Sequence, residues 1–304
     1  MIYKKIALLG MGLVASSIAL AARKHGLVGE IAGHTRTAGS TKLARGLKLA
    51  DEMFESPEEA VRGADLVLLC TPILAFGDLV GRIAPHLEPG ATLSDVGSVK
   101  SQVIETVSPL VPPGINFVPA HPLAGTEQSG PQAGFANLFE GRWCIITPDE
   151  STDKPAMHRL VQFWEGMGAQ VDFMDPGRHD LVLAVTSHAP HLIAYSMVGV
   201  ADHLRRVTNS EVVKYSAAGF RDFTRIAASD PTMWRDVFLT NREATLDILG
   251  RFTEELFSLQ RAIRTGDGEE LHRYFSETRA IRRGIIEAGQ DTSLTDFGRH
   301  ADRK

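Results

Sequence analysis

The sequence predicts a two-domain protein in which an α/β, doubly wound parallel sheet is followed by an all-helical domain. The chain has 304 residues, and domains average roughly 150 residues, so the length favours two domains. Short apolar strands alternate with helices up to about residue 174, a pattern typical of a parallel sheet covered on both faces. No strand pattern follows that point. We therefore predict a first domain over residues 1–174, a helical domain over 175–289 and a polar tail over 290–304.

The first domain begins with a strand at Lys4–Leu9, followed by a glycine turn and a helix that reaches about His25. Asp65–Thr71 is apolar on both faces, as a buried parallel strand should be. Ser56-Pro57 predicts a helix start, with Ser as the cap and Pro at the first position. Further helices are predicted around Ser40–Gly46 and Lys154–Gly168. The other predicted strands cover Glu30–His34, Met53–Phe54, Thr92–Val96, Asn116–Ala120, Trp143–Thr147 and Gln170–Met174.

The second domain is predicted from three helical stretches. His179–Leu204 is long and apolar, and Pro190 inside it should produce a kink. Asp230-Pro231 starts a helix that we expect to continue to Thr265, because its apolar residues recur close to every 3.6 positions. A last helix covers about Glu269–Ala288. Apolar residues surround much of the long helix, which favours a homodimer formed through the C-terminal helices.

The composition limits the classes of partner. Against 32 basic residues there are 37 acidic ones, and the net charge of −5 argues against nonspecific binding to nucleic acid or an anionic membrane. Two cysteines, Cys70 and Cys144, cannot form a disulfide framework and suit a cytoplasmic protein. The uncharged run Ile6–Ala22 superficially resembles a signal peptide, but it contains glycines and serines and lacks a clear cleavage site.

A better interpretation of that run is the turn Gly10–Ala15, which has the form G-x-G-x-x-A. Gly10 permits a tight turn, Gly12 lets a pyrophosphate approach the backbone, and the small Ala15 lets the next helix pack on the strand. The N-terminus of that helix presents free N–H groups and its positive dipole end to the phosphates. Because the motif lies between a strand and a helix, it predicts a Rossmann-type dinucleotide site.

The end of the second predicted strand bears on which dinucleotide is bound. An NAD site often has Asp or Glu there to bind the ribose 2′-hydroxyl, whereas this sequence has Thr35 and Arg36. This pair could accommodate a 2′-phosphate, or Arg36 could stack on adenine or point to solvent. NAD and NADP are therefore both plausible cofactors. The predicted cofactor-binding residues are completed by Leu13, Thr71 and Pro72.

Two polar motifs, Ser94–Lys100 and Pro119–Glu127, directly follow predicted strands. Ligands of open parallel sheets bind at the carboxyl ends of the strands, so His121 should lie where a substrate meets the nicotinamide. A neutral His is a suitable proton acceptor near neutral pH.

The helical half contains two further candidate groups. Ser187 and His191 are four residues apart and should share a helix face. His188 and His191 invite a metal hypothesis, but two helical histidines without further ligands at matching spacing are insufficient. Arg225 could clamp a substrate carboxylate, or it could form a structural pair with Asp222.

In combination, these motifs resemble the prephenate/arogenate (cyclohexadienyl) dehydrogenase family, in its single-function form without a fused regulatory domain. The resemblance implies a Rossmann domain, a helical dimerisation domain, and oxidative decarboxylation of prephenate to 4-hydroxyphenylpyruvate in tyrosine biosynthesis. Some members of the family instead convert arogenate to tyrosine. The matching motifs span roughly residues 4–265 and are the glycine turn, Asp95–Lys100, His121–Glu127, Ser187–His191, Phe223–Ala227, Asp230-Pro231 and Trp234.

The resemblance also implies roles for individual residues. His121 would be the catalytic base, with Ser98 hydrogen-bonding in the same cluster, and Arg225 would hold a substrate carboxylate. Glu127 and Asp222 could form an ionic gate near Arg225. The remaining pocket residues would be Thr126, Ser187 and His191.

Two other functions would fit the same architecture. Another Rossmann oxidoreductase of a small carboxylate substrate would share the fold without needing both His121 and Arg225. A non-catalytic dinucleotide-sensing dimer could keep the glycine turn without a base or a clamp. Turnover of prephenate discriminates between the three.

Overall fold

The computed structural model describes residues 1–208, 214 and 216–287. These fall into two compact units, Met1–Leu246 and the chain from Asp247 onward. The predicted polar tail, residues 290–304, lies outside the described residues. All of the residues predicted to bind ligands belong to the first unit.

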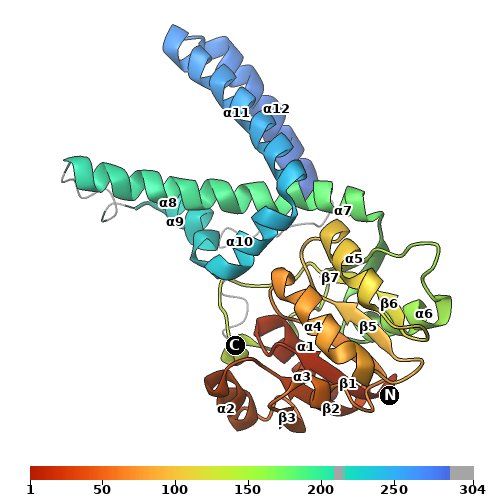
Figure 1. Ribbon diagram of the computed structural model, residues 1–304. Coiled ribbons are helices and arrows are strands. Elements are labelled where there is room, and N and C mark those ends of the chain that lie inside the picture. Colours follow the sequence, from red (N-terminus) through yellow and green to blue (C-terminus); the bar gives the residue numbers. More distant parts are fainter. Residues whose placement is uncertain (209–213, 215, 288–304) are drawn as a thin grey trace. The chain divides into compact units, whose positions relative to one another are not determined.

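The predicted doubly wound sheet is present, with six parallel strands in the order β3-β2-β1-β4-β5-β6 (Figure 1). The order reverses between β1 and β4, and in such sheets ligands bind outside the carboxyl ends of the strands at that reversal. The strands are β1 (Tyr3–Leu9), β2 (Val28–His34), β3 (Glu52–Phe54), β4 (Leu66–Leu69), β5 (Thr92–Asp95) and β6 (Asn116–Val118). The accompanying helices are α1 (Leu13–Lys24), α2 (Ala38–Gly46), α3 (Pro57–Ala60), α4 (Phe76–Ile83), α5 (Ser101–Val107) and α6 (Lys154–Gly166).

A second, three-stranded sheet corrects the expectation of a single strand at Asn116–Ala120. The chain leaves the parallel sheet at Pro119 and enters β7 (Ala120–Pro122). This strand pairs antiparallel with β8 (Trp143–Ile146), which pairs parallel with β9 (Gln170–Phe173). Pro119 has no N–H to donate to a strand ladder, which favours an interruption there. His121 therefore lies within β7 and not in the loop after a parallel strand.

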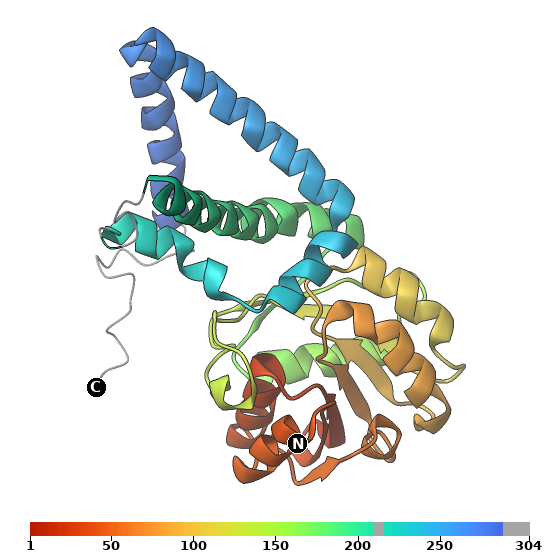
Figure 2. The same ribbon diagram turned by 60° about the vertical axis from the view of Figure 1, so that its left-hand side comes forward.

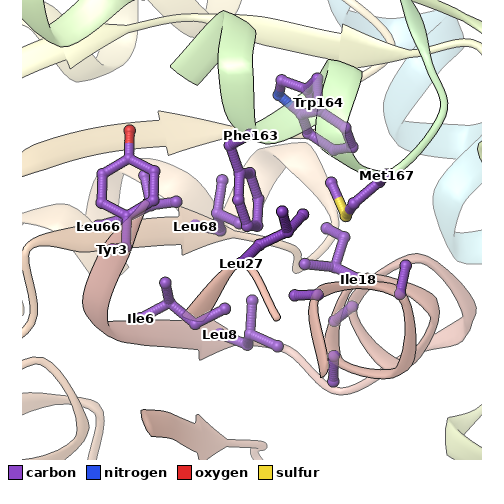
Figure 3. Close-up of a cluster of buried hydrophobic side chains, with 14 of the residues drawn as sticks. Tyr3, Ile6, Leu8, Ile18, Leu27, Leu66, Leu68, Phe163, Trp164 and Met167 are labelled. Carbon is purple, nitrogen blue, oxygen red and sulfur yellow. The ribbon is translucent and has the colours of Figure 1, made fainter. Parts of the chain in front are cut away.

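The core lies on both faces of the large sheet. The β4 sequence Leu-Val-Leu-Leu is wholly buried, and alternate residues point to opposite faces. On one face Leu66 and Leu68 pack with Phe163 and Trp164 of α6 (Figure 3). On the other face Val67 and Leu69 join the core formed with α3, α4 and α5. Burial on both faces fixes the strand ends that carry the site.

The predicted apolar stretch after residue 175 forms α7 (Pro176–Leu183), a π-helical turn (Ala184–His188) and α8 (Ala189–Thr208). Figure 2 shows α7 and α8 (green) as one nearly continuous path. In a regular helix the Pro190 ring would collide with the carbonyl four residues earlier. The sequence predicted a kink at Pro190, whereas the structure has a widened π-helical turn directly before it. Such turns are frequent at functional sites.

The prediction of a single helix over Pro231–Thr265 is wrong. The structure has two helices there, α10 (Pro231–Thr240) and α11 (Arg242–Thr265). Asn241 lies at the break with φ −106° and ψ 45°, and its side chain is buried. Its amide donates to the Asp180 carbonyl oxygen at 2.8 Å. Tertiary hydrogen bonding of one polar residue thus overrides the apolar periodicity. The predicted start is confirmed, since the Asp230 carboxylate accepts from the N–H groups of Thr232 and Met233.

The first unit also contains α9 (Ala218–Thr224), and the second contains most of α11 together with α12 (Gly268–Glu287). No residue of α12 is buried. Large apolar side chains on these two helices are exposed, and they include Leu256, Phe257, Ile263, Phe275, Ile281 and Ile285.

Among the described residues, one helical stretch, Pro176–Leu204, is long and apolar enough to cross a membrane by length and composition. It carries His179, Asp180 and His188, all of them buried. These side chains hydrogen-bond within the protein, as described below.

Candidate active site

The glycine turn has the geometry that its predicted role requires. Gly10 has φ +103°, and a Cβ there would lie 2.7 Å from the carbonyl oxygen of Cys70 on the neighbouring strand connection, so only glycine fits. A Cβ on Gly12 would meet open space, at the cap of α1 where no side chain satisfies the helix N–H groups. Ala15 is buried against the sheet. The backbone N–H groups of α1 are thus available to an anion.

The other predicted cofactor residues lie at neighbouring strand ends of this edge. Leu13 is the first residue of α1, and Thr35 and Arg36 follow β2, with Arg36 exposed. Thr71 and Pro72 follow β4, and the buried Thr71 hydroxyl has no hydrogen-bond partner within the described structure. A helix N-terminus without a side-chain cap, open space above Gly12 and a buried Thr71 hydroxyl without a partner fit a bound dinucleotide.

His121 is 7% exposed, and its imidazole is held by a second histidine. Its Nδ1 lies 2.9 Å from Nε2 of His179, and Nδ1 of His179 lies 2.8 Å from Oδ1 of Asp180. The Asp180 carboxylate also accepts the backbone N–H groups of Lys100 at 2.7 Å and Ser101 at 2.9 Å. The predicted base therefore ends a chain of three buried groups that connects β7 to α7 and to the N-terminus of α5.

The backbone immediately before His121 is clamped by a buried ion pair. Lys100 and Asp95 are fully buried and in direct contact. Lys100 Nζ also donates to the Ala120 carbonyl oxygen at 2.7 Å, while Asp95 Oδ1 accepts the Ala120 N–H at 3.3 Å. Both polar groups of the Ala120 residue are thus bound by one pair of side chains. This clamp fixes where the chain changes sheets and hence where His121 points.

Burial sets the protonation of the site. Burial lowers the pKa of His121 well below 6.5. Electrostatic repulsion from His179, Lys100 and His188 lowers it further, because a positive charge on any of them disfavours a second one on His121. Burial also lowers the pKa of His179, although the hydrogen bond to Asp180 opposes the shift. The pKa of His188 is lowered to about 4, again chiefly by burial. All three imidazoles are therefore neutral at neutral pH, and His121 is available as a proton acceptor.

Ser98 lies half-buried in the loop between β5 and α5. Ser98 was expected to hydrogen-bond in the cluster of His121, and its hydroxyl makes no direct hydrogen bond to that ring among the described residues. Its backbone instead approaches His188, whose Nδ1 lies 3.0 Å from the Asn241 amide. Ser98 therefore contacts His188, a neighbour of His121 and His179, with its backbone.

The two predicted residues of the helical half lie together at the π-helical turn. The ring Nδ1 of His191 is 2.8 Å from the Ser187 carbonyl oxygen, which can only accept, so that nitrogen carries the proton. The same ring stacks on Trp234 with centroids 3.7 Å apart, and His188 meets Trp234 edge to face. Among the described residues, no group of three or more His, Cys, Asp or Glu side chains is arranged so that it could hold a metal ion.

Arg225 forms an ion pair with Glu127, its Nη1 lying 2.6 Å from Oε2. The side chains are 51% and 25% exposed, respectively, so the pair is open to solvent. It joins the turn after α9 to the loop after β7, in which Thr126 is exposed and accepts the Gln128 N–H. Asp222 lies half-buried on α9, three residues before Arg225. The structure thus pairs Arg225 with Glu127, one of the two carboxylates that the resemblance placed near it.

Sequence reasoning missed several residues of this site. His179, Asp180 and Asn241 were not among the candidates, and Lys100 and Asp95 had no assigned role. A signal was present in the apolar stretch, because Asp180 and His188, two turns apart, are polar positions on one helix face. No sequence signal places Asn241 against them, since that contact joins distant parts of the chain.

Comparisons with known proteins show the family to which the chain belongs. A family model described as "Prephenate dehydrogenase, nucleotide-binding domain" matches residues 18–173, and one described as "Prephenate dehydrogenase, dimerization domain" matches residues 175–277. The chain belongs to the prephenate dehydrogenase family. Members of this family are NAD(P)-dependent oxidoreductases, and the chain carries both the nucleotide-binding and the dimerization domain of the family.

Individual relatives cover nearly the whole chain. A cyclohexadienyl dehydrogenase of Zymomonas mobilis is 40% identical over 92% of this chain and 96% of its own length. A prephenate dehydrogenase of Bacillus subtilis is 34% identical over 92% of this chain and 76% of its own length. Prephenate dehydrogenase of Aquifex aeolicus, solved with hydroxyphenyl propionate and NAD+, has a TM-score of 0.86 at 34% identity and covers 93% of this chain and 98% of its own.

Proposed function

We propose that this chain catalyses the oxidative decarboxylation of prephenate to 4-hydroxyphenylpyruvate, transferring hydride to NAD(P)+. The observation that carries the proposal is a buried, neutral His121 held by His179 in the same unit as a solvent-open Arg225. This reaction requires two groups from the protein, a base that accepts the hydroxyl proton and a cation that binds a substrate carboxylate. Membership of the prephenate dehydrogenase family supplies the substrate class.

In the proposed reaction the bound NAD(P)+ supplies the hydride acceptor. His121 takes the proton of the ring hydroxyl as hydride leaves C4 of the substrate. Departure of CO2 from C1 makes the ring aromatic, and the oxygen recovers a proton as the phenol. Arg225 exchanges Glu127 for a substrate carboxylate, and Glu127 with Asp222 gates access to it. Ser98 is proposed to hydrogen-bond in the cluster of His121, and Thr126, Ser187 and His191 are proposed to line the pocket.

Arogenate is the second candidate substrate, favoured by the name of the Zymomonas mobilis relative and by a Synechocystis arogenate dehydrogenase structure with a TM-score of 0.74 at 28% identity. The decisive experiment combines prephenate and arogenate with NAD+ and NADP+ and follows formation of the reduced nicotinamide. Turnover of prephenate supports the proposal, and absence of turnover in all four combinations contradicts it. In the last case a dinucleotide-sensing role becomes the better hypothesis.

Replacement of Arg36 tests the choice of cofactor. The exposed Arg36 follows β2 where NAD sites often carry an acid, so we expect measurable use of NADP+. Arg36→Ala should raise KM for NADP+ roughly tenfold or more, because hydrogen bonds to charged groups contribute about 1.5–3 kcal/mol. KM for NAD+, which lacks the 2′-phosphate, should hardly change. Arg62→Ala, which removes another exposed arginine of the same domain, is the control, and equal effects of Arg36→Ala on both cofactors would contradict the assignment.

A homodimer would cover the exposed apolar residues of α11 and α12. Those helices carry Phe257 and Ile263 at 64% and 67% exposure, and isologous pairing is the commonest way to bury such a face. Light scattering at micromolar concentration should give about twice the chain mass. Phe257→Asp with Ile263→Asp should yield monomers, while Leu110→Asp, an exposed apolar position of the first unit, should not. A fully active wild-type monomer would overturn this assignment.

We place the protein in the cytoplasm, with a small-molecule substrate and without a nucleic-acid or membrane partner. Both cysteines are free thiols, as expected in a reducing compartment. The apolar stretch Pro176–Leu204 contains three buried polar side chains, His179, Asp180 and His188, that hydrogen-bond within the protein, which argues against a membrane span.

A further inference from the structure

Asp180, His179 and His121 form a hydrogen-bonded series in which each group determines whether the next one donates or accepts. Its three side chains are at most 7% exposed as residues, and the two contacts between them measure 2.8 and 2.9 Å. Each of these contacts can hold one proton. The position of that proton in the first contact determines its position in the second.

Asp180 fixes the first proton. Its carboxylate accepts the N–H groups of Lys100 and Ser101 as well as the contact from His179, and hydrogen bonds of this kind favour the ionised form. An ionised carboxylate can only accept, so Nδ1 of His179 must carry the hydrogen. The pKa of Asp180 is accordingly lowered, since these hydrogen bonds outweigh its burial.

The second proton follows from the first. A neutral imidazole has one N–H and one free lone pair, so Nε2 of His179 is an acceptor. Nδ1 of His121, 2.9 Å away, must then donate. The free lone pair of His121 is left on Nε2, the nitrogen that is not engaged by the protein network. A protonated His179 would reverse this arrangement, but burial lowers its pKa and keeps it neutral.

We propose that His179 and Asp180 are positioning residues that hold His121 in the tautomer with hydrogen on Nδ1 and a free lone pair on Nε2. The pair also holds the plane of the His121 ring. Asn241 anchors it from the other side by donating to the Asp180 carbonyl oxygen, so the network is fixed to the helices as well as to the α5 N-terminus. The catalytic consequence rests on the proposed function, whereas the tautomer itself does not.

Two substitutions of His179 separate contact with His121 from contact with Asp180. In His179→Gln, the amide oxygen can occupy the place of Nε2 and still accept from His121. In His179→Asn, the shorter amide can occupy the place of Nδ1, which keeps Asp180 but leaves His121 without a partner. Asp175→Asn is the matched control, because Asp175 caps the same helix and Asn caps a helix equally well.

The readouts are the tautomer of His121, measured by 15N NMR of histidine-labelled protein without substrate, and the steady-state constants. The His121 signal is assigned by its absence in His121→Asn. Wild type, Asp175→Asn and His179→Gln should show Nδ1–H. His179→Asn should lose that preference, and its kcat should fall on the order of tenfold to a hundredfold, by analogy with partners that orient metal-bound histidines. KM should change little, because His179 is not proposed to touch the substrate.

Each outcome decides the matter. An Nε2–H tautomer in wild type overturns the proposal without any variant, so misfolding of a variant cannot protect it. An unchanged tautomer in His179→Asn also overturns it, as do equal losses of kcat in His179→Gln and His179→Asn. If wild type fails to oxidise prephenate and arogenate, the proposed function falls, and the NMR result still judges the network.

Discussion

Replacing His121 by Asn is expected to lower kcat by roughly 10²–10⁴-fold, the usual contribution of positioned acid–base catalysis. Asn is of modest size and forms hydrogen bonds, but it cannot accept a proton at neutral pH. Cofactor affinity should hardly change, because His121 does not belong to the glycine turn. Steady-state kinetics with saturating cofactor measure the effect, and His158→Asn, at an exposed position of α6, is the control.

The pH profile offers a second measurement of the same base. Burial and the neighbouring His179, Lys100 and His188 lower the pKa of His121 well below 6.5, and only its neutral form can accept a proton. Activity should therefore be constant through neutral pH and decline only as the pH falls through that lowered pKa. If His121→Asn turned over near the wild-type rate, the base would be another residue or water, and the proposed mechanism would be wrong.

Replacing Arg225 by Ala should act on substrate binding. It removes a charge-assisted contact to a carboxylate, and losses of such partners cost on the order of 2–4 kcal/mol. The substrate concentration needed for half-maximal rate should rise, with a much smaller change in kcat than in His121→Asn. Cofactor affinity should again be unchanged. The two variants thus have opposite kinetic signatures.

Thermal stability tests whether Arg225 binds the substrate or forms an ion pair that stabilises the fold. Arg225 is 51% exposed and its pair with Glu127 is open to solvent, and surface pairs contribute about 0–1 kcal/mol. Arg225→Ala should therefore keep its Tm. Arg82→Ala is a close control, because the Arg82–Glu58 pair has almost the same exposure, 48% and 24%, and lies outside the site. Unfolding of Arg225→Ala, with Arg82→Ala stable, would favour a structural ion pair.

The Rossmann half could be predicted because its signals are local. The Gly10–Ala15 motif needs only the steric freedom of glycine, and the β4 strand needs only a run of apolar residues buried on both faces. The helix start at Ser56 follows from a side chain that binds its own next turn, and the start at Asp230 in the helical half has the same local cause. Each of these features is determined within a few consecutive residues, and the structure confirms them.

The surroundings of His121 were decided by tertiary structure. Sequence order identified His121 as a candidate, but the change of sheet at Pro119 depends on Lys100 and Asp95 binding the Ala120 residue from the neighbouring strand end. The break at Asn241 depends on its amide reaching Asp180, 61 residues away along the chain. Periodicity predicted an unbroken helix there, because it counts apolar positions and not the hydrogen bonds that a buried polar group requires.

The sequence by itself determined the glycine turn, the parallel sheet, the helical second half and the two residue types, His and Arg, that the proposed chemistry needs. Only the tertiary structure decided that Asp180 and His179 lie behind His121, and that Lys100 and Asp95 bind the backbone just before it. The physical reason is the range of the interactions. Steric and periodic preferences act between neighbours in the chain, whereas protonation state and tautomer depend on which buried groups the folded chain brings within about 3 Å.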